Sequence, residues 1–236
     1  MKIAVVVPFY NEEKNLIFFA KEWSNYFYLR KKIKNDFTFF FINDGSTDNS
    51  VKIIKRKITN IKFKIINKKN TGHSDSCRFA YQLIIKNYKI FNYILQIDSD
   101  NQCNPKYLDI FLKLIRKRNF FFIFGYRFQR ADGYLRYLFS RIMSYAVFAK
   151  KFLFIKDLNV PYRIMRVIEL KKILTEIDVN KNYKKIKLFN CLLTYVIQKK
   201  YPINWINIKF RKRYHGKSKY SFVKMTYMFL NFIFFI

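Results

Sequence analysis

Strand-like apolar segments alternate with helical segments over the first 130 residues, and this alternation is the strongest constraint on the fold. Lys2 to Phe9 is a continuous β-branched run, which is typical of a strand buried on both faces. Further strands are predicted at 37–42, 63–66, 93–97 and 120–126. Helices are predicted at 12–30, 74–88 and 105–118, and a further helix follows an N-cap at 46–48 and ends at residue 57. Strands separated by helices form mainly parallel sheets with helices on both faces. The sequence therefore predicts an α/β fold.

The pattern is looser in the last hundred residues. We predict a long helix at 134–152, an irregular crossing at 157–161, a helix near 184–200 and a strand at 203–210. Residues 225–236 are apolar except for Thr226 and Asn231. As a helix they reach roughly 18 Å, which is less than the ~30 Å hydrocarbon core of a bilayer. They are expected to form a core helix, an interfacial helix or the beginning of an incomplete span.

The formal charge of +32 favours anionic partners such as nucleoside diphosphates or lipid headgroups. Lys, Asn, Ile, Phe and Tyr are all abundant, as in the product of an AT-biased coding sequence, so the charge alone selects no partner. Basic residues are spread along the chain and most aromatic residues fall inside apolar segments. Nucleic-acid binding is therefore the more distant hypothesis, and no nucleic-acid partner is expected.

The cysteines and the N-terminus suggest a cytosolic chain. Cys77, Cys103 and Cys191 lie far apart in the sequence and lack the spacing of a metal site, so we expect reduced thiols. Met1 and Lys2 lead directly into the first strand, and no signal peptide is expected.

Polar residues gather where the predicted strands end, at the edge where open parallel sheets bind ligands. After the fourth strand, Asp98 and Asp100 form an Asp-x-Asp motif, with Gln102 two residues further on. Glycine-rich phosphate-binding motifs of the GxGxxG and GxxxxGK[ST] types are absent from the sequence. Paired carboxylates offer hard oxygen ligands for Mg²⁺ or Mn²⁺, which in turn bridges a diphosphate. The blander alternative is that Asp98 caps the next helix while Asp100 is solvated.

Four successive motifs, "VVPFYNEEKNL", "FFINDGSTDNS", "NTGHSDSCRFAYQ" and "YILQIDSDNQCNP", resemble those of inverting, metal-dependent glycosyltransferases of family 2. The downstream segments "FGYR", "RYLFS", "KDLNVPYRIM" and "FRKRYHGKSKY" are most similar to the polyprenyl-phosphate (dolichol-phosphate) sugar synthase branch. The resemblance runs from residue 2 to about 220. It implies a GT-A fold with a Rossmann-like sheet in a domain of residues 1–217, followed by an apolar C-terminal helix at 218–236.

The resemblance also implies which residues bind the nucleotide-sugar donor. Tyr10 is expected to pack on the base, Glu12 to reach the base or ribose, and Asp44 to accept a base N–H, whereas an Asx-turn is the alternative role of Asp44. Asp98, Asp100 and Gln102 are the implied metal ligands, and Arg213 is implied to close over the diphosphate with Ser218 and Lys219. The complete set of implied donor-binding residues is Pro8, Tyr10, Glu12, Asp44, Asn70, Gly72, Asp98, Ser218 and Lys219.

Two arginines, Arg127 and Arg136, are implied to bind the acceptor phosphate, because a guanidinium binds phosphate oxygens in a bidentate manner. The implied catalytic residues are Asp100, Arg213 and Asp157. Asp157 is either a base or an orienting carboxylate, or it only holds its loop, and we favour the last role. His73 and His215 receive no chemical role.

The expected acceptor is a polyprenyl phosphate, used by a peripheral or monotopic enzyme at the cytoplasmic face of the membrane. Basic and apolar residues in the helix at 134–152 and in the final helix suit a surface of anionic lipids. The main alternative acceptor is a sugar hydroxyl in a cell-surface polysaccharide or glycolipid, which requires a base such as Asp157. A nucleotidyltransferase and a family member without turnover are further alternatives.

Overall fold

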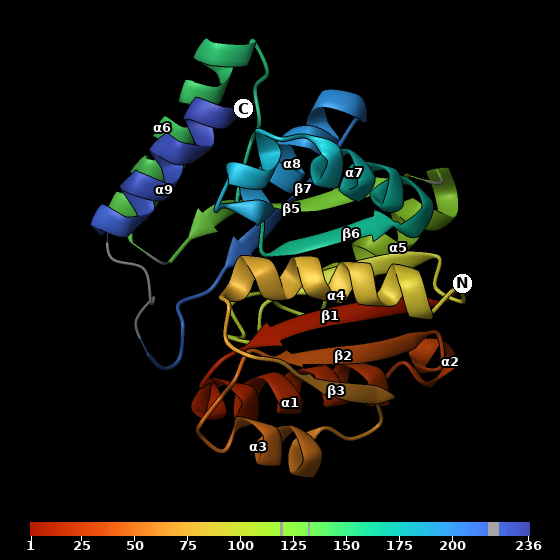
Figure 1. Ribbon diagram of the computed structural model, residues 1–236. Coiled ribbons are helices and arrows are strands. Elements are labelled where there is room, and N and C mark those ends of the chain that lie inside the picture. Colours follow the sequence, from red (N-terminus) through yellow and green to blue (C-terminus); the bar gives the residue numbers. More distant parts are fainter. Residues whose placement is uncertain (119, 132, 217–221) are drawn as a thin grey trace.

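A mixed β-sheet with helices on both faces forms the centre of the computed structural model, which describes residues 1–118, 120–131, 133–216 and 222–236 (Figure 1). Within these residues the sheet has seven strands in the order β3-β2-β1-β4-β6-β5-β7. The strands are β1 (Ile3–Phe9), β2 (Phe37–Asn43), β3 (Phe63–Asn67), β4 (Tyr93–Ile97), β5 (Phe122–Arg130), β6 (Tyr162–Arg166) and β7 (Asn204–Phe210). The predicted α/β class, with a mainly parallel sheet, is confirmed.

Only β6 runs against its neighbours among the described strands, since it pairs antiparallel with β4 and β5. Neither β6 nor the helix that follows it was predicted from the sequence. The segment contains Arg163, a residue type that seldom lies in a buried strand. Arg163 is fully buried, donates to the backbone oxygens of Val160 and Asn190 and lies over the ring of Phe124. Hydrogen bonds to these carbonyls allow its charge to be buried.

The helices divide between the two faces of the sheet. One face is covered by α1 (Glu13–Tyr28), α3 (Ser50–Lys57) and α5 (Tyr107–Arg118), and the other by α4 (His73–Asn87), α7 (Val167–Val179) and α8 (Phe189–Lys200). Short α2 (Lys31–Lys34) and the 3₁₀ turn η1 (Tyr183–Lys185) lie in connections. Each face buries its own apolar cluster against the sheet, and the two clusters fix the strand ends that carry the polar residues.

The last helix, α9 (Phe222–Phe235), lies beside α6 (Tyr134–Lys151) at one end of the molecule (Figure 1). Phe139 of α6 and Phe229 of α9 meet edge to face, and Phe232 is fully buried. No described helix is both long and apolar enough to span a bilayer. The predicted domain boundary between residues 217 and 218 lies outside the described residues.

Gly125 is where β5 and β7 approach too closely for a side chain. A Cβ at this position would lie 2.7 Å from Cδ1 of Ile208, which is 1% exposed. We expect Gly125→Ala to lower the free energy of unfolding by about 1–3 kcal/mol, because overpacking forces neighbouring groups to shift. Adding Ile208→Val removes the clashing methyl group and should recover part of the loss. Urea titration of the single and double variants measures both effects, and equal stability of Gly125→Ala and wild type would contradict the close approach.

Candidate active site

A cavity of about 470 Å³ lies at the carboxyl ends of the parallel strands. Residues from ten separate parts of the chain line it, from the end of β1 to the start of α9. Most of the site residues predicted from the sequence are among them, namely Pro8, Tyr10, Glu12, Asp44, Asn70, Gly72, Asp98, Asp100, Gln102, Arg127, Arg136 and Arg213. Ser218 and Lys219 lie outside the described residues.

Two carboxylates, Asp98 and Asp100, follow β4 and line this cavity. Asp98 Oδ1 lies 3.0 Å from Nε2 of His73, the first residue of α4. Burial alone would raise the pKa of Asp98, but His73 and, more weakly, Arg163 hold it below its usual value. Burial and the neighbouring charge of Asp98 raise the pKa of Asp100 to about 7. The cavity wall therefore carries Asp98, whose ionised form is favoured, beside Asp100, whose ionised form is disfavoured until a cation binds nearby.

The oxygen donors around Asp100 fit a divalent ion. Asp98 and Asp100 supply hard carboxylate oxygens, and the raised pKa of Asp100 reflects negative charge that a cation would relieve. Nε2 of Gln102 donates to the backbone oxygen of Arg211 at 2.8 Å, which orients the amide and leaves its oxygen for a ligand. Over the described residues, His, Cys, Asp and Glu form no group of three or more that could hold a metal. Further oxygens would have to come from Gln102 and a bound diphosphate.

Asp44 is already engaged by protein groups. It is 3% exposed, accepts the backbone N–H groups of Thr71 at 3.0 Å and Gly72 at 2.9 Å, and pairs with Lys68. Burial alone would raise the pKa of Asp44, but these donors, Lys68 foremost, lower it. The turn after β2 is instead closed by Asn43, whose Oδ1 accepts the N–H of Ser46 at 2.9 Å. Contact between Asp44 and a base N–H stays a prediction.

Glu12 and Arg213, both predicted to bind the donor, form an ion pair with each other. The segment after β7 is held against α1 nearby. Asn15 exchanges two hydrogen bonds of 3.0 Å with the backbone of His215, and the rings of Phe18 and Tyr214 stack 4.5 Å apart. Arg213 therefore lies at the cavity wall, on a segment that crosses from β7 to the first helix.

Asp157 and Arg127 form a bidentate ion pair, with distances of 2.7 and 2.8 Å. Asp157 is 1% exposed and is not one of the residues lining the cavity, whereas Arg127 is. Burial alone would raise the pKa of Asp157, but the Arg127 guanidinium holds it below its usual value. This geometry matches the loop-holding role better than that of a base.

The part of the cavity lining that comes from α6, α9 and the end of β5 is both basic and apolar, and within it only Arg136 was predicted from the sequence to bind the acceptor. Arg130, Arg136 and Lys224 supply basic groups. The apolar part comes from α6 and α9 and consists of Phe139, Met143, Met225 and Met228. The sequence shows that Phe139 and Met143 are four residues apart and so share one face of a helix, but it does not show that this face packs against α9. His73, which was assigned no chemical role from the sequence, pairs with Asp98 in the structure.

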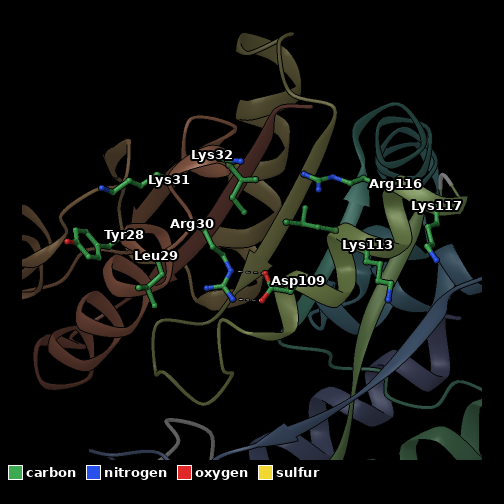
Figure 2. Close-up of a pocket in the computed structure, with 11 residues that line it drawn as sticks. Tyr28, Leu29, Arg30, Lys31, Lys32, Asp109, Lys113, Arg116 and Lys117 are labelled. Atoms are coloured by element: carbon green, nitrogen blue, oxygen red, sulfur yellow. Dashed lines mark hydrogen bonds and ion pairs between the residues drawn. The ribbon is translucent and has the colours of Figure 1, made fainter.

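A larger open hollow of about 940 Å³ lies at the opposite edge of the sheet, where β2 and β5 begin (Figure 2). Its basic residues are in α2 and in the last turns of α5, where cations interact favourably with helix C-termini. Its acid, Asp109, is paired with Arg30. We therefore place the candidate active site in the smaller cavity.

The model of the family "Glycosyl transferase family 2" matches residues 4–185. An uncharacterized protein of Methanocaldococcus jannaschii is 27% identical over 177 residues, which cover 70% of this chain and 72% of that protein.

Several solved structures share the fold at low sequence identity. S. aureus TarS 1-349 in complex with UDP-GlcNAc has a TM-score of 0.63 and 18% identity, covering 99% of this chain and 65% of that one. Glucosyl-3-phosphoglycerate synthase from Mycobacterium tuberculosis, with phosphoglyceric acid, has a TM-score of 0.61 and 12% identity, covering 97% and 76%. The mannosyltransferase PcManGT from Pyrobaculum calidifontis, with GDP-Man and Mn²⁺, has a TM-score of 0.56 and 12% identity, covering 91% and 58%. These similarities support the GT-A type of fold.

Proposed function

The chain belongs to glycosyl transferase family 2, and from this membership we propose that it transfers a sugar from a nucleotide-sugar donor to a polyprenyl phosphate. The observation that carries the proposal is the composition of the cavity. Its lining includes the acidic pair Asp98 and Asp100, and it also combines the basic side chain of Arg136 with the apolar side chains of Phe139 and Met228 on α6 and α9. An acceptor with an anionic head and an apolar tail would match this second group of residues.

The donor would bind between the ends of β1, β2 and β4. Asp98, Asp100 and Gln102 would hold Mg²⁺ or Mn²⁺, which when bound neutralises charge on the leaving diphosphate. Arg213 lies on the same wall and would add a second positive charge there. S. aureus TarS was solved with UDP-GlcNAc and PcManGT with GDP-Man and Mn²⁺, so both uridine and guanosine donors are candidates.

The reaction breaks the bond between the anomeric carbon and the diphosphate oxygen and forms a bond from that carbon to an acceptor oxygen. In-line attack from the opposite side inverts the configuration. A phosphate acceptor is already ionised at neutral pH, so no proton has to be removed. A sugar hydroxyl would need a general base, and Asp157, the candidate from the sequence, is buried in its pair with Arg127. This difference favours a phosphate acceptor.

The outer surfaces of α6 and α9 support the proposal that the acceptor is membrane-bound. Apolar side chains are exposed along both helices, at Tyr134, Leu135, Tyr137, Leu138, Ile142, Tyr145, Phe148, Val223, Tyr227, Leu230 and Phe234. Arg136, Arg141, Lys150 and Lys151 lie on the same α6. Apolar side chains flanked by cations are the pattern of interfacial helices on anionic lipids. We infer a peripheral or monotopic enzyme.

Membrane association is tested with vesicles that contain anionic phospholipid. The wild type should float with them at low salt, and Ile142→Glu with Leu230→Glu should largely abolish flotation, because both apolar side chains are exposed. Ile168→Glu is the matched control, since Ile168 is 62% exposed on α7 but lies away from this surface. Wild-type protein that stays at the bottom of the gradient would contradict the membrane proposal.

The acceptor is tested by offering radiolabelled nucleotide sugars with a polyprenyl phosphate, the matching polyprenol and an oligosaccharide. We expect label in the lipid fraction only with the phosphate, together with release of a nucleoside diphosphate. Transfer of label to the oligosaccharide alone would contradict the phosphate acceptor and would favour a sugar hydroxyl as the acceptor. Loss of transfer to the lipid phosphate in Arg136→Ala, with the donor affinity unchanged, would support the acceptor role of that wall.

A further inference from the structure

Three segments that are distant in the sequence meet beside the acidic pair at one ion pair, Arg211–Glu22. The two guanidinium nitrogens of Arg211, which follows β7, bind the carboxylate of Glu22 on α1 at 2.9 and 2.8 Å. The same side chain donates to the backbone oxygen of Asn101 at 2.9 Å, and Asn101 Nδ2 donates back to Glu22 at 3.0 Å. The turn that carries Asp100 is thus joined to the first helix and to the end of the last strand.

The backbone of Arg211 is joined to this turn as well. Its N–H donates to the oxygen of Gln102 at 2.9 Å, and its own oxygen accepts Nε2 of Gln102 at 2.8 Å. Arg211 therefore holds the two residues that directly follow Asp100, namely Asn101 and Gln102, and Gln102 is itself a potential metal ligand. It also begins the segment that brings Arg213, two residues later, to the cavity wall.

The turn has a backbone conformation that needs such support. Asn101 has φ = 60°, in the left-handed region that residues other than glycine seldom adopt, and is 1% exposed. Nε of Arg211 and Oδ1 of Asn101 are buried without a partner in the part of the chain that the structure describes. Buried polar atoms without partners are costly, so stability alone is a poor reason for this arrangement.

We propose that the Arg211–Glu22 pair is a positioning device for the metal and diphosphate site, acting through Asp100, Gln102 and Arg213 without touching the substrate. The inference rests on the proposed function. A partly exposed ion pair contributes little to global stability, so the effect should appear in ligand geometry. Groups that orient metal ligands typically change metal affinity or activity by about 10–100-fold when they are replaced.

The chain contains a matched control pair. Arg30 and Asp109 also form a bidentate ion pair, through Nε at 2.9 Å and Nη2 at 2.6 Å, in the hollow at the opposite edge of the sheet (Figure 2). Their side chains are 31% and 43% exposed, compared with 25% and 28% for Arg211 and Glu22. Replacing either pair removes a similar ion pair, but only one of them adjoins the acidic turn.

The experiment measures Mn²⁺ affinity from the signal of free Mn²⁺ in electron paramagnetic resonance, with UDP and with GDP, alongside thermal unfolding. Glu22→Gln and Arg211→Lys should weaken Mn²⁺ binding by about 10–100-fold and lower kcat more than they raise the donor KM. Asp109→Asn and Arg30→Lys should leave Mn²⁺ affinity unchanged while shifting Tm by a similar amount.

The outcomes separate this inference from the proposed function. If the wild type binds Mn²⁺ with a nucleotide and the Glu22→Gln and Arg211→Lys variants bind it equally well, the positioning role is overturned and the proposed function is not. A wild type that binds no Mn²⁺ with either nucleotide would overturn the donor site itself. Equal loss of Mn²⁺ affinity in the control pair would show a general effect of stability and would also overturn the positioning role.

Discussion

Asp100→Asn should reduce kcat for sugar transfer by at least about 10²–10³-fold while leaving the protein folded. The amide keeps the shape of the side chain but removes the charge that a divalent ion needs, and loss of one such electrostatic contact typically has an effect of this size. Steady-state kinetics with saturating Mn²⁺ and donor give the ratio. Activity within threefold of the wild type would contradict the role of Asp100.

The same substitution has an unusual expected effect on stability. Burial and the neighbouring Asp98 raise the pKa of Asp100 to about 7, so its ionised form destabilises the metal-free protein above that pH. This destabilisation is complete above about pH 7 and is relieved progressively as the pH falls from about 7 toward the unfolded value of about 3.9. The metal-free Asp100→Asn variant should therefore have a Tm at least equal to that of the wild type at pH 8. Asp75→Asn, at an exposed carboxylate on α4, is the control and should leave kcat unchanged.

Asp157→Asn should lower the free energy of unfolding by about 3–5 kcal/mol at pH 7, because it leaves the buried guanidinium of Arg127 without its counter-charge. Urea titration measures the loss, and Asp36→Asn, which breaks the exposed pair with Lys2, should change stability by less than about 1 kcal/mol. If Asp157→Asn changes stability no more than Asp36→Asn, the buried pair does not hold the loop.

The pH dependence of this effect has a definite sign. Arg127 outweighs the burial of Asp157 and holds its folded pKa below the usual value of about 3.9. The stabilisation is therefore present above the unfolded pKa and is lost as the pH falls through the lower folded value. The difference in stability between the wild type and Asp157→Asn should shrink in acid and stay constant from pH 6 to 8.

Strands β1, β2 and β4 could be predicted because they are almost wholly apolar and buried on both faces, a pattern that local sequence carries directly. β4 was placed at residues 93–97, as in the structure. β6 could not be predicted, because the burial of Arg163 depends on carbonyls of Val160 and Asn190 that only the tertiary fold brings together. Local patterns do not reveal such long-range partners.

The same limit applies to the candidate site. The strand-end rule predicted that Asp98, Asp100 and Gln102 lie close to Glu12, and the family resemblance added Arg213; all five line one cavity. Neither the rule nor the resemblance could indicate that Glu12 forms an ion pair with Arg213 or that Lys68 forms one with Asp44, because these contacts depend on the paths of whole loops. Of the acceptor-wall residues on α6 and α9, only Arg136 was predicted from the sequence to bind the acceptor, because the apolar residues meet only through packing between segments about ninety residues apart.

The central claim is that the acidic pair after β4 serves sugar transfer from a nucleotide donor. The most direct test incubates the purified chain with a panel of UDP- and GDP-sugars, Mn²⁺ or Mg²⁺ and a polyprenyl phosphate, and identifies the released product by chromatography. We predict release of a nucleoside diphosphate that requires the divalent ion and is lost in Asp100→Asn. Release of pyrophosphate would instead indicate nucleotidyl transfer. No product from any donor, or equal release by Asp100→Asn, would contradict the claim.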